Sequence, residues 1–561
     1  MKFLDELKKV LVSDDRFVGE ADQIIKTKVS DAARANDEKL LKALLNNDLL
    51  KEAFFTKVDD IYVFDKNKFV WVLESKEFLP DSFTIYKNKI GLVDSYNNLI
   101  SQKQDISLVW PYKDCFLEGG QTKEDQKIDE IFYNETLAPD QVNRLLAPKV
   151  LGNAKRYTKD GIEENIEFNE DDNLIIKGNN LIALSALLEK YEGKVQLIYI
   201  DPPYNTGNDS FKYNDRFNHS TWLTFMKNRL ELAFKLLKED GSMYVQIDNN
   251  ESAYLKVLMD DIFKKENFQA EIIWVLEGAS GYKSLVNNFV RGHDTIFFYS
   301  KDNKFKYNKT YLPYGEKQLK RFANIDEDGR RYKTITKSRK LYLDEAKGIP
   351  LTDIWSDIAS FQTIVNSPER TGFDTQKPEK LIERIISCSS DKDDLILDFH
   401  LGSGTTASVA HKMGRKYIGI EQMDNQIDLS LERLKKVIEG EQSGISKNVN
   451  WQGGGSFVYC ELLEDNESLV NELEKAENTE QVKIVLNKAI DNGKLIPSVL
   501  HSDLKENEDD FDKLSLDEQK DLVMELLNKN QLYVNLSDID DEDYKVSEAD
   551  KVFTRSFYGK E

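Results

Sequence analysis

The chain has 561 residues, enough for more than one domain, and its 40% of hydrophobic residues is typical of a globular protein. No apolar run is long enough to cross a bilayer and the N-terminus carries no signal-peptide core, so we expect a cytoplasmic protein without a membrane segment. The net charge of −23 argues against a general nucleic-acid binder, and the wide separation of the three cysteines argues against a metal site or a disulfide framework.

Residues 1–150 are predicted to form an N-terminal accessory domain. Leucines at helical spacing indicate helix within residues 32–55, whereas residues 60–73 and 83–93 have the pattern of short strands with turns. The fragment 109–120 ends in a pair of glycines and is interpreted as a packed connector, because its residues indicate no chemistry of their own.

Residues 151–277 alternate between strand and helix patterns and are predicted to form the first half of an α/β domain with a parallel sheet and helices on both faces. Ser220 is expected to cap one helix, which ends at Gly241. Asp248 and Asn249 follow a strand, either as caps or as site residues. Strands are expected over residues 174–176, 195–200, 243–247 and 272–275, and further helices over residues 181–188 and 251–263.

The strand over residues 195–200 leads into Asp201-Pro202-Pro203-Tyr204, the segment that determines the expected chemistry. Neither proline donates a backbone hydrogen bond, so the segment forms a stiff loop at the carboxyl end of a strand, where open α/β sheets place their sites. A carboxylate, a proline carbonyl and an aromatic face together suit the activation of an exocyclic amine on a flat base. The alternative is a purely structural turn in which Asp201 is a cap.

Residues 278–372 interrupt the alternation with a basic stretch that is rich in tyrosine. Between Lys301 and Lys340 there are thirteen basic and five acidic residues, a net charge of +8 in a chain of −23. This composition favours contact with phosphates and some readout of bases, although a solvated lysine-rich surface has the same composition.

The alternation resumes over residues 373–455, the predicted second half of the α/β domain. Thr375-Gln376-Lys377-Pro378 precedes a helix over residues 381–390, with Pro378 suited to its first turn. A strand over residues 395–398 leads into a glycine turn over residues 399–406 and a helix that ends near Met413, and the strand over residues 417–421 follows. A glycine turn after one strand and an acid at the end of the next are typical of a Rossmann-like ligand site, for which NAD or a nucleotide is an alternative ligand.

Residues 456–561, after three successive glycines, are predicted to form an acidic C-terminal domain. Residues 461–561 include 12 basic and 27 acidic residues, a net charge of −15. Apolar residues at helical spacing indicate a folded helical region. Because its charge repels phosphates, we expect this region to face a protein partner.

The segment Asp201–Tyr204, followed by Asn205-Thr206-Gly207, resembles the catalytic motif of amino-methylating DNA methyltransferases. The glycine turn that follows it resembles the cofactor motif of the class in which the catalytic motif comes first. Over roughly residues 172–455, the sequence is similar in particular to the modification (Mod) subunits of type III restriction–modification systems. The resemblance implies a Rossmann-like methyltransferase sheet, with residues 278–372 as an inserted target recognition domain and with N- and C-terminal accessory domains.

The resemblance also implies roles for single residues. Tyr204 holds a flipped-out adenine, Asp201 and Pro202 orient its N6 amine, and Pro203 completes the catalytic segment. Double-stranded DNA would be contacted by Lys320, Arg321, Arg330, Arg331, Lys333, Arg339 and Lys340. S-adenosylmethionine would be bound by Asn205, Thr206, Gln376, Lys377, Pro378, Asp398, Phe399, His400, Gly402, Ser403, Gly404, Thr405 and Glu421, with no metal.

The expected activity is site-specific methylation of adenine N6 in DNA by a Mod dimer with a helicase–nuclease (Res) partner. His400 departs from the family pattern, in which many relatives have an aromatic residue, and is interpreted as a packing or cofactor-lining residue. The alternatives are a stand-alone adenine methyltransferase, a cytosine-N4 methyltransferase, for which Ser is more usual at the position of Asp201, and a DNA-binding protein without activity.

Overall fold

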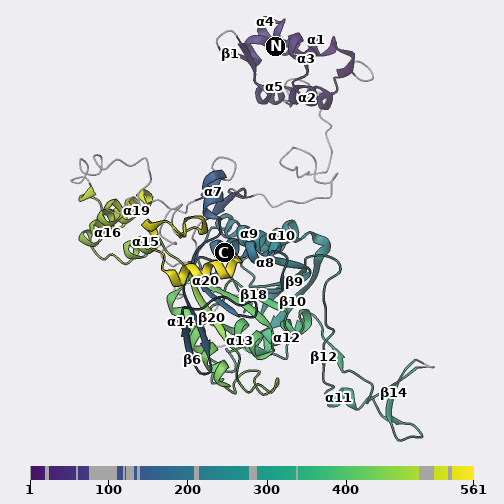
Figure 1. Ribbon diagram of the computed structural model, residues 1–561. Helices are drawn as coiled ribbons and strands as arrows, with labels where there is room; N and C mark the ends of the chain where they lie inside the picture. The colour runs from purple at the N-terminus through teal and green to yellow at the C-terminus, as the bar shows by residue number, and fades with distance from the viewer. Residues whose placement is uncertain are drawn as a thin grey trace. The chain divides into compact units, whose positions relative to one another are not determined.

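The computed structural model describes residues 2–18, 24–58, 61–74, 110, 112–117, 121, 132–134, 139–207, 214–276, 287, 289–336, 339–465, 467–491, 511–527 and 533–560. The chain divides into two compact units, Met1–Ile106 and Ser107–Glu561 (Figure 1). Each unit has a hydrophobic core of its own, so they are described separately.

The N-terminal unit is a small helical fold with one hairpin. Its helices bury Leu40, Leu44, Phe54 and Phe69 in a common core. The elements are α1 (Lys2–Val12), η1 (Asp15–Phe17), α2 (Lys26–Arg34), α3 (Glu38–Leu45), α4 (Asp48–Phe54), β1 (Phe55–Val58), β2 (Ile61–Phe64) and α5 (Lys66–Glu74).

The helical prediction for residues 32–55 is confirmed, but as separate helices. Helix α3 ends at Leu45, and after a short turn the side chain of Asn47 caps α4. The predicted strands over residues 60–73 are only partly right. Ile61–Phe64 is a strand, but residues from Lys66 onward form α5, whose Phe69 and Leu73 pack into the core. The strand predicted over residues 83–93 lies outside the described residues.

The C-terminal unit is built on a sheet with eleven strands in its described residues. In spatial order these are β17 (Ile354–Trp355), β10 (Phe268–Val275), β11 (His293–Ser300), β9 (Leu237–Ile247), β8 (Val195–Ile200), β18 (Leu395–Asp398), β19 (Lys416–Glu421), β7 (Leu174–Lys177), β20 (Phe457–Leu462), β5 (Leu151–Thr158) and β6 (Gly161–Glu164). The six strands from β9 to β20 are mutually parallel. Antiparallel pairs flank them, β9 with β11 on one side and β20 with β5 on the other.

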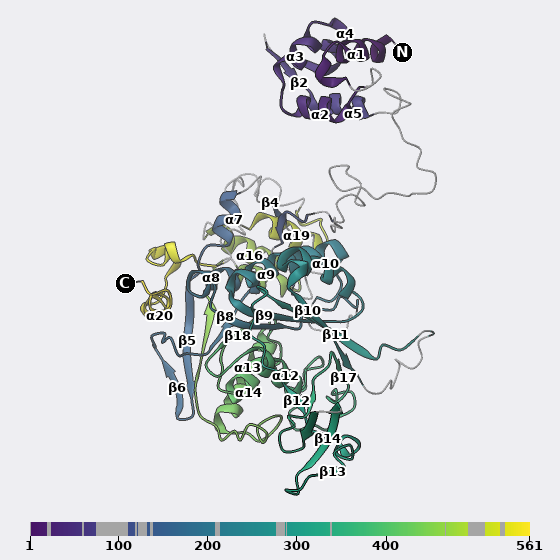
Figure 2. The same cartoon turned by 90° about the vertical axis from the view of Figure 1, so that its right-hand side faces the viewer.

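Helices cover both faces of this sheet (Figure 2). On one face lie α8 (Asn180–Tyr191), α9 (His219–Leu236) and α10 (Ser252–Phe263), and on the other lie α12 (Glu379–Ser389), α13 (Thr405–Lys412) and α14 (Asp424–Glu439). Each layer has its own core, the first containing Trp222 and the second containing Ile385. The predicted α/β architecture is therefore confirmed, as are the strands predicted in both halves of the domain.

Two local predictions are wrong, and a third is only partly right. Helix α9 begins at His219 after Asn218, so Ser220 lies inside its first turn and does not cap it. The helix ends at Leu236 and passes directly into β9, so Gly241 lies in a strand, where a Cβ would come within 3.0 Å of the Val195 carbonyl oxygen. The strand predicted over residues 272–275 exists as β10, but it runs antiparallel to its neighbour β11.

Residues 301–353 project from the sheet between β11 and β17, and we call them the projection. The projection contains β12 (Tyr311–Leu312), α11 (Glu316–Leu319), β13 (Asn324–Ile325), β14 (Arg331–Thr336), β15 (Arg339–Tyr342) and β16 (Ile349–Pro350). Figure 1 shows β12, α11 and β14 extending away from the layered sheet. Because β11 and β17 both pair within the main sheet, both ends of the projection are anchored to it.

The remaining elements pack around the sheet. Strand β20 begins two residues after Gly455 and pairs with both β7 and β5. Helix α20 (Glu548–Tyr558) buries Phe553 and Phe557 in the core on the α8 side. The others are β3 (Cys115–Leu117), β4 (Phe132–Asn134), α7 (Pro139–Leu145), η5 (Lys265–Asn267), α15 (Glu467–Glu474), α16 (Thr479–Asp491), α19 (Leu516–Leu526), η8 (Leu536–Asp538) and η9 (Glu542–Tyr544). None of the described helices is both long and apolar enough to span a bilayer.

Candidate active site

The two sequence motifs meet at one edge of the sheet. Strands β8 and β18 are parallel neighbours, so the loop that starts at Asp201 and the loop that starts after Asp398 leave the same edge. The chain then continues from β8 to β9 on one side and from β18 to β19 on the other, which is the topological switch point where open α/β sheets bind ligands. A cavity of about 500 Å³ lies there, lined by residues of both loops.

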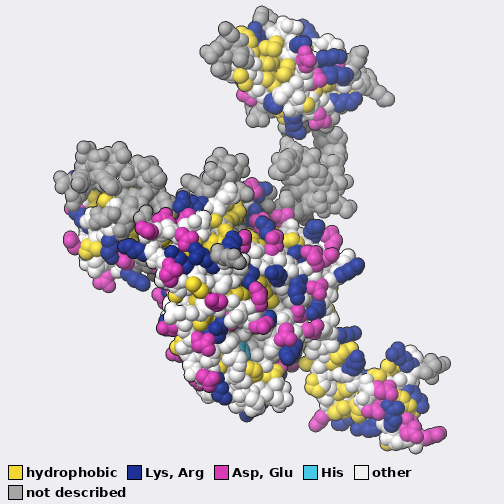
Figure 3. Space-filling view, viewed as in Figure 1, with side chains coloured by type: hydrophobic (Ala, Val, Ile, Leu, Met, Phe, Trp, Pro, Cys, Tyr) yellow, Lys and Arg dark blue, Asp and Glu magenta, His cyan; other side chains and the backbone are white. Residues whose placement is uncertain are grey.

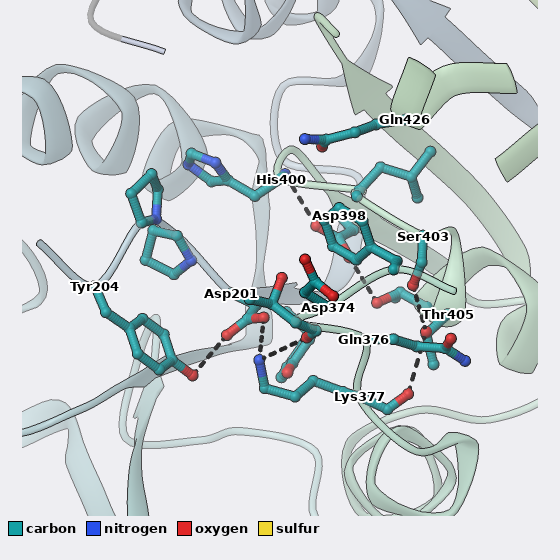
Figure 4. Close-up of a pocket in the computed structure, with 18 of the residues that line it drawn as sticks. Asp201, Tyr204, Asp374, Gln376, Lys377, Asp398, His400, Ser403, Thr405 and Gln426 are labelled. Carbon is teal, nitrogen blue, oxygen red and sulfur yellow. Dashed lines mark hydrogen bonds and ion pairs between the residues drawn. The ribbon is translucent and has the colours of Figure 1, made fainter. Parts of the chain in front are cut away.

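The Asp201 carboxylate is contacted from two sides (Figure 4). The Tyr204 hydroxyl donates to its Oδ1 at 2.7 Å, and the Lys377 ammonium pairs with its Oδ2. In the same loop, the indole of Trp222 donates to the Pro203 carbonyl at 2.9 Å. Among the described residues, no donor contacts the Pro202 carbonyl, which therefore remains available as an acceptor beside Asp201.

The rest of the loop is held by the buried carboxylate of Asp215. It accepts from the backbone N–H groups of Asn205 at 2.8 Å and Thr206 at 3.0 Å. Asn205 has a left-handed backbone with φ 58°, donates from its side chain to Glu251 at 2.6 Å, and accepts from the backbone of Phe217 at 2.7 Å. Asn205 thus holds the shape of the loop, whereas Thr206 lines the cavity.

Burial dominates the electrostatics of the catalytic loop. It raises the pKa of Asp201 above its ordinary value, while Lys377 and Tyr204 oppose that rise. Burial and the carboxylates of Asp201 and Asp294 raise the pKa of Tyr204 well above 10, so its hydroxyl stays protonated and can act only through hydrogen bonds.

On the other side of the cavity, Glu421 ends β19 and supports the glycine turn. Its carboxylate accepts from the backbone N–H groups of Gly402 at 2.8 Å, Gln422 at 2.9 Å and Met423 at 3.0 Å. Burial nevertheless raises the pKa of Glu421 to about 7. Asp398 accepts from the His400 N–H at 3.0 Å and the Thr406 hydroxyl at 2.6 Å, and burial likewise raises its pKa to about 7.

Two glycines of the turn have conformations that other residues rarely adopt. Gly402 has φ +53°, and a Cβ there would lie 3.3 Å from the ring of Phe373, which also lines the cavity. Gly404 has φ +73° and is the N-cap residue of α13, where a Cβ would lie 3.0 Å from the Ser430 hydroxyl. The glycines therefore permit both the left-handed turn and the close approach of neighbouring groups.

The segment before α12 reaches the cavity from the third side. Gln376 is held by its contacts with Thr371 and the Glu369 carbonyl, and Pro378 is the N-cap residue of α12. Thr405 donates to the Lys377 carbonyl at 3.3 Å and accepts from Arg433 at 2.8 Å. Thr375, Gln376 and Lys377 of this segment line the cavity, whereas Pro378 does not. Phe399 and Ser403 of the glycine turn also line it.

Beneath this segment lies a buried charge cluster. Glu379 pairs with Lys412 and Arg433 at 2.8 Å each. Burial alone would raise the pKa of Glu379, but the two cations hold it at about 2. The cluster joins α12, α13 and α14 behind the cofactor loop, so the loop rests on a rigid base.

His400 lies in the cavity wall and is half-buried. Burial and the nearby Arg229 lower its pKa to about 3, so its ring is neutral. The ring lies among Phe225, Phe399 and the amide of Asn180. These contacts suit a lining residue and not a general base.

The seven proposed DNA contacts all lie within residues 301–353, and none of them lines the cavity. Figure 3 shows lysine and arginine side chains gathered on this part of the molecule. Arg330 is paired with Asp344 and Glu345, and Arg331 donates to the carbonyls of Phe322 and Leu319, so both help to hold the projection together. Lys333 and Lys340 lie over aromatic rings. Within the described part of the chain, Lys320, Arg321 and Arg339 are exposed and have no acidic partner.

The cavity also includes residues that the motif search missed. Asp294 comes from the start of β11, Arg291 from the residues just before that strand, and Trp274 from the end of β10. Gln121 also lines the cavity, and Trp110 and Leu117 of the fragment before it bond to α9 through Thr224 and Asn228. The only sequence signal for Asp294 is an acid at the beginning of a strand, whereas the catalytic motif lies at the end of a strand. Asp248 pairs with Arg291 but does not itself line the cavity.

No group of three or more His, Cys, Asp or Glu in the described residues could hold a metal ion. The site as described contains acids that can accept from an amine or from hydroxyls, one lysine, and an apolar and aromatic lining. This set can bind a flat polar ring and a second ligand at the same time.

Comparisons with known proteins identify the relatives of this chain. A family model described as "DNA methylase" matches residues 195–432, and one described as "Type III restriction/modification enzyme methylation subunit" matches residues 37–92. The probable type III restriction–modification enzyme HindVI Mod subunit of Haemophilus influenzae is 34% identical over 99% of this chain and 98% of its own length.

More partial matches include the type II methyltransferase M.EcaI of Enterobacter cloacae, 30% identical over 45% of this chain and 66% of its own length. Among solved structures, the complex of M1.HpyAVI with SAM matches at 18% identity and a TM-score of 0.31, covering 46% of this chain and 98% of that one.

Proposed function

This chain belongs to the family of type III restriction–modification Mod subunits, which are DNA methyltransferases, and we propose that it methylates N6 of adenine in double-stranded DNA with S-adenosylmethionine as the donor. The observation that carries the proposal is the single cavity in which the Asp201 loop and the Gly402 loop meet. A methyl acceptor and a methyl donor must share such a space for direct transfer.

The residues on the Glu421 side fit S-adenosylmethionine. Glu421 is a buried acid whose carboxylate faces the cavity, and hydroxyls of a ribose are suitable donors to it. Phe373, Leu401 and Ile420 offer an apolar lining for a purine ring. The donor carries a sulfonium cation, which the nearby acids Asp201 and Asp398 tolerate. The glycine turn leaves room for the ligand beside the backbone.

On the Asp201 side, the loop acts on the amine of the target base. Bound S-adenosylmethionine would supply the methyl group by cleavage of its S–CH3 bond, with a neutral thioether as the leaving group. The Asp201 carboxylate and the Pro202 carbonyl accept the two hydrogens of the amine, which draws its lone pair out of the ring and toward the methyl carbon. As the new N–C bond forms, the amine loses a proton, and Asp201 is the acceptor beside it. Tyr204 offers its ring face to the base.

A base inside a duplex cannot reach this cavity, so the target adenine must leave the stack. We propose that residues 278–372 form the target recognition domain and that the basic projection contacts the DNA backbone. Its lysines and arginines would supply the salt-dependent part of binding, and bidentate arginines would read guanines.

We also propose that the chain acts as a dimer in the cytoplasm with a helicase–nuclease Res subunit. Membership of the Mod family supports the Res partner. The acidic residues 456–561 would face that partner, since their charge disfavours contact with DNA. A stand-alone adenine methyltransferase is the second candidate, which the partial match to a type II methyltransferase favours.

The acceptor base is tested directly by chemistry. Purified protein is incubated with S-adenosylmethionine carrying a labelled methyl group and unmodified DNA, and the DNA is digested to nucleosides for mass spectrometry. We expect the label in N6-methyladenine. Label in N4-methylcytosine would refute the adenine assignment, and no label in either, with the protein folded and DNA bound, would refute the activity. Genes beside this one that encode a Res subunit, or their absence, distinguish the two candidates.

A further inference from the structure

The Tyr204 hydroxyl lies between two carboxylates, and only one of them belongs to the catalytic segment. Its oxygen is 2.7 Å from Asp201 Oδ1 and 3.3 Å from Asp294 Oδ2. A hydroxyl has one hydrogen and therefore donates to one acceptor at a time. The shorter distance indicates that it donates to Asp201 in this structure.

Asp294 is held firmly although it is far from Asp201 in the chain. It lies on β11, is 3% exposed, and lines the cavity. The side-chain amide of Gln246 donates to Asp294 Oδ2 at 2.9 Å, and the Tyr199 hydroxyl donates to the side-chain oxygen of Gln246 at 2.8 Å. Gln246 and Tyr199 are themselves buried. This chain of hydrogen bonds fixes the position of the Asp294 carboxylate.

Asp294 nevertheless has acceptor capacity that the structure does not use. Its Oδ1 is buried and accepts no hydrogen bond from the described residues, and its nearest cation, Arg291, is 3.4 Å away. A buried carboxylate oxygen without a donor is costly, and such groups are frequently part of a functional site. The oxygen that faces the Tyr204 hydroxyl is Oδ2, and because a carboxylate oxygen has two lone pairs, it can accept from Tyr204 in addition to Gln246.

Asp294 is needed as an acceptor because of the contacts that the Asp201 carboxylate already makes. Both of its carboxylate oxygens are already engaged, one by Tyr204 and the other by Lys377. The proposed reaction requires the amine of the target base to donate to this same carboxylate. A carboxylate oxygen can accept two hydrogen bonds, but release of the Tyr204 hydroxyl leaves more of the negative charge of Oδ1 for the amine. Lys377 instead carries the charge that stabilises Asp201 as an anion.

We propose that Asp294 is a positioning residue that accepts the Tyr204 hydroxyl when the amine of the target base takes its place on Asp201. The exchange needs only a rotation of the O–H bond, so the Tyr204 ring keeps its place and continues to offer its face to the base. This inference rests on the proposed function of Asp201. It adds a residue outside the catalytic motif to the machinery of the transfer.

The exchange predicts what happens when Asp294 is neutralised. In Asp294→Asn, the Tyr204 hydroxyl loses its charged alternative and competes with the base amine for Asp201. A hydrogen bond to a charged group is worth enough to slow methyl transfer by about tenfold to a hundredfold. S-adenosylmethionine affinity should stay near wild type, because the cofactor residues are on the Glu421 side.

The decisive variant is the double substitution. Tyr204→Phe keeps the aromatic face but has no hydroxyl to compete for Asp201, so Asp294→Asn combined with Tyr204→Phe should be faster than Asp294→Asn alone. If the role of Asp294 is merely structural, the losses from the two substitutions add. The double variant should then be slower than Asp294→Asn alone. The measurement is the single-turnover rate of methyl transfer with S-adenosylmethionine and DNA bound in advance.

The chain offers a matched control. Tyr299 donates to Asp260 at 2.7 Å, a tyrosine–aspartate pair in the same unit, and neither residue lines the cavity. Asp260→Asn should leave the single-turnover rate unchanged. If Asp294→Asn does not bind S-adenosylmethionine and so fails to fold, the smaller Asp294→Ser takes its place in both arms of the test.

The outcomes separate this inference from the proposed function. Loss of transfer in wild-type protein would overturn the proposed function itself. If wild type is active and Asp294→Asn transfers methyl at a rate within about twofold of the wild-type rate, the role of Asp294 is overturned. A double variant no faster than Asp294→Asn would also overturn it, whereas rescue by Tyr204→Phe supports the exchange.

Discussion

The ammonium group of Lys377 pairs with the carboxylate of Asp201, although 176 positions separate the two residues in the chain. Their side chains are 11% and 18% exposed, so solvent screens the pair only partly. Lys377 belongs to the segment before α12, and its carbonyl also accepts from Thr405 of the cofactor loop. One residue thus links the loop that starts at Asp201 to the glycine turn and stabilises the ionised form of the carboxylate.

Removing the charge of Lys377 should shift the acid limb of activity. Burial raises the pKa of Asp201 and Lys377 lowers it, so Lys377→Met should raise that pKa further. Because the reaction uses the ionised carboxylate, the rise of kcat/KM with pH should then occur at higher pH than in wild type. Lys380→Met, which removes an exposed lysine in the first turn of α12, should leave the profile in place. Identical profiles for wild type and Lys377→Met would show that the pair does not control Asp201.

Asp201→Asn should remove methyl transfer and spare cofactor binding. The amide keeps the shape of the side chain but accepts weakly from the base amine and cannot take its proton, so we expect a loss of at least about a hundredfold in kcat. Calorimetry should give an S-adenosylmethionine affinity close to that of wild type, since Glu421 and the glycine turn are unchanged. Turnover above a tenth of the wild-type value would contradict the role of Asp201.

Cofactor affinity should increase as the pH rises through about 7. Burial raises the pKa of Glu421 to about 7, and only its ionised form accepts from two ribose hydroxyls in addition to its backbone partners. Glu421→Gln should weaken binding by about tenfold and reduce the pH dependence. Asp398, whose pKa is also raised to about 7 by burial, still titrates in this variant, so some dependence should persist. The measurement is calorimetric titration at several pH values, and a flat wild-type curve would refute the assignment.

The same two acids have a predictable effect on folding. Their pKa values in the folded protein lie above those of an unfolded chain, near 4, so the folded state binds protons more tightly between about pH 4 and about pH 7. Their contribution to the free energy of unfolding therefore decreases as pH rises through this window. Bound S-adenosylmethionine should offset part of that loss.

Gly402→Val should block cofactor binding for two reasons. The side chain would force a left-handed residue with φ +53° to carry a branched Cβ, and that Cβ would lie 3.3 Å from the Phe373 ring in the cavity wall. Gly193→Val separates the two effects, because Gly193 has φ +65° but no atom within 4 Å of the Cβ position. We expect Gly193→Val to lower thermal stability and keep S-adenosylmethionine affinity, measured by calorimetry. Equal affinities in the two variants would mean that Gly402 does not adjoin the ligand.

The exposed bases of the projection should control the salt dependence of DNA binding. Combined Lys320→Ala and Arg321→Ala should weaken binding and reduce the slope of log affinity against log salt by about two, one for each lost phosphate contact. Lys159→Ala, in the turn between β5 and β6 at the opposite edge of the sheet, removes an exposed charge and should leave the slope unchanged. Fluorescence anisotropy at several salt concentrations measures both.

A separate experiment tests which residues recognise the target DNA sequence. Exchanging the projection, residues 301–353, for that of a relative should change the methylated sequence and leave adenine N6 as the acceptor, because β11, β17 and Asp294 stay in place. A folded, active exchange protein that still modifies the original sequence would move recognition elsewhere, most simply to the first 150 residues. Arg330 and Arg331 are unsuitable for substitution here, because their contacts hold the projection together.

The sequence by itself determined each half of the site. Apolar runs of strand length, the two prolines after Asp201 and the glycines after Asp398 are local signals, because backbone propensities and the side-chain period of a strand act over a few residues. From these the two strand ends, their loops and the acid at Glu421 followed correctly. The local signals misplaced the end of α9, since the chain passes from helix to strand without a break and Gly241 looked like a helix end.

Only the tertiary structure decided which of these parts meet. The adjacency of β8 and β18 depends on strand pairing between distant segments, as does the antiparallel return of β11 that brings Asp294 to Tyr204. The same is true of Lys377 beside Asp201 and of the acids that engage Arg330. Such contacts are set by the register of the sheet and the packing of its helices, which involve the whole unit at once, so no window of the sequence contains them.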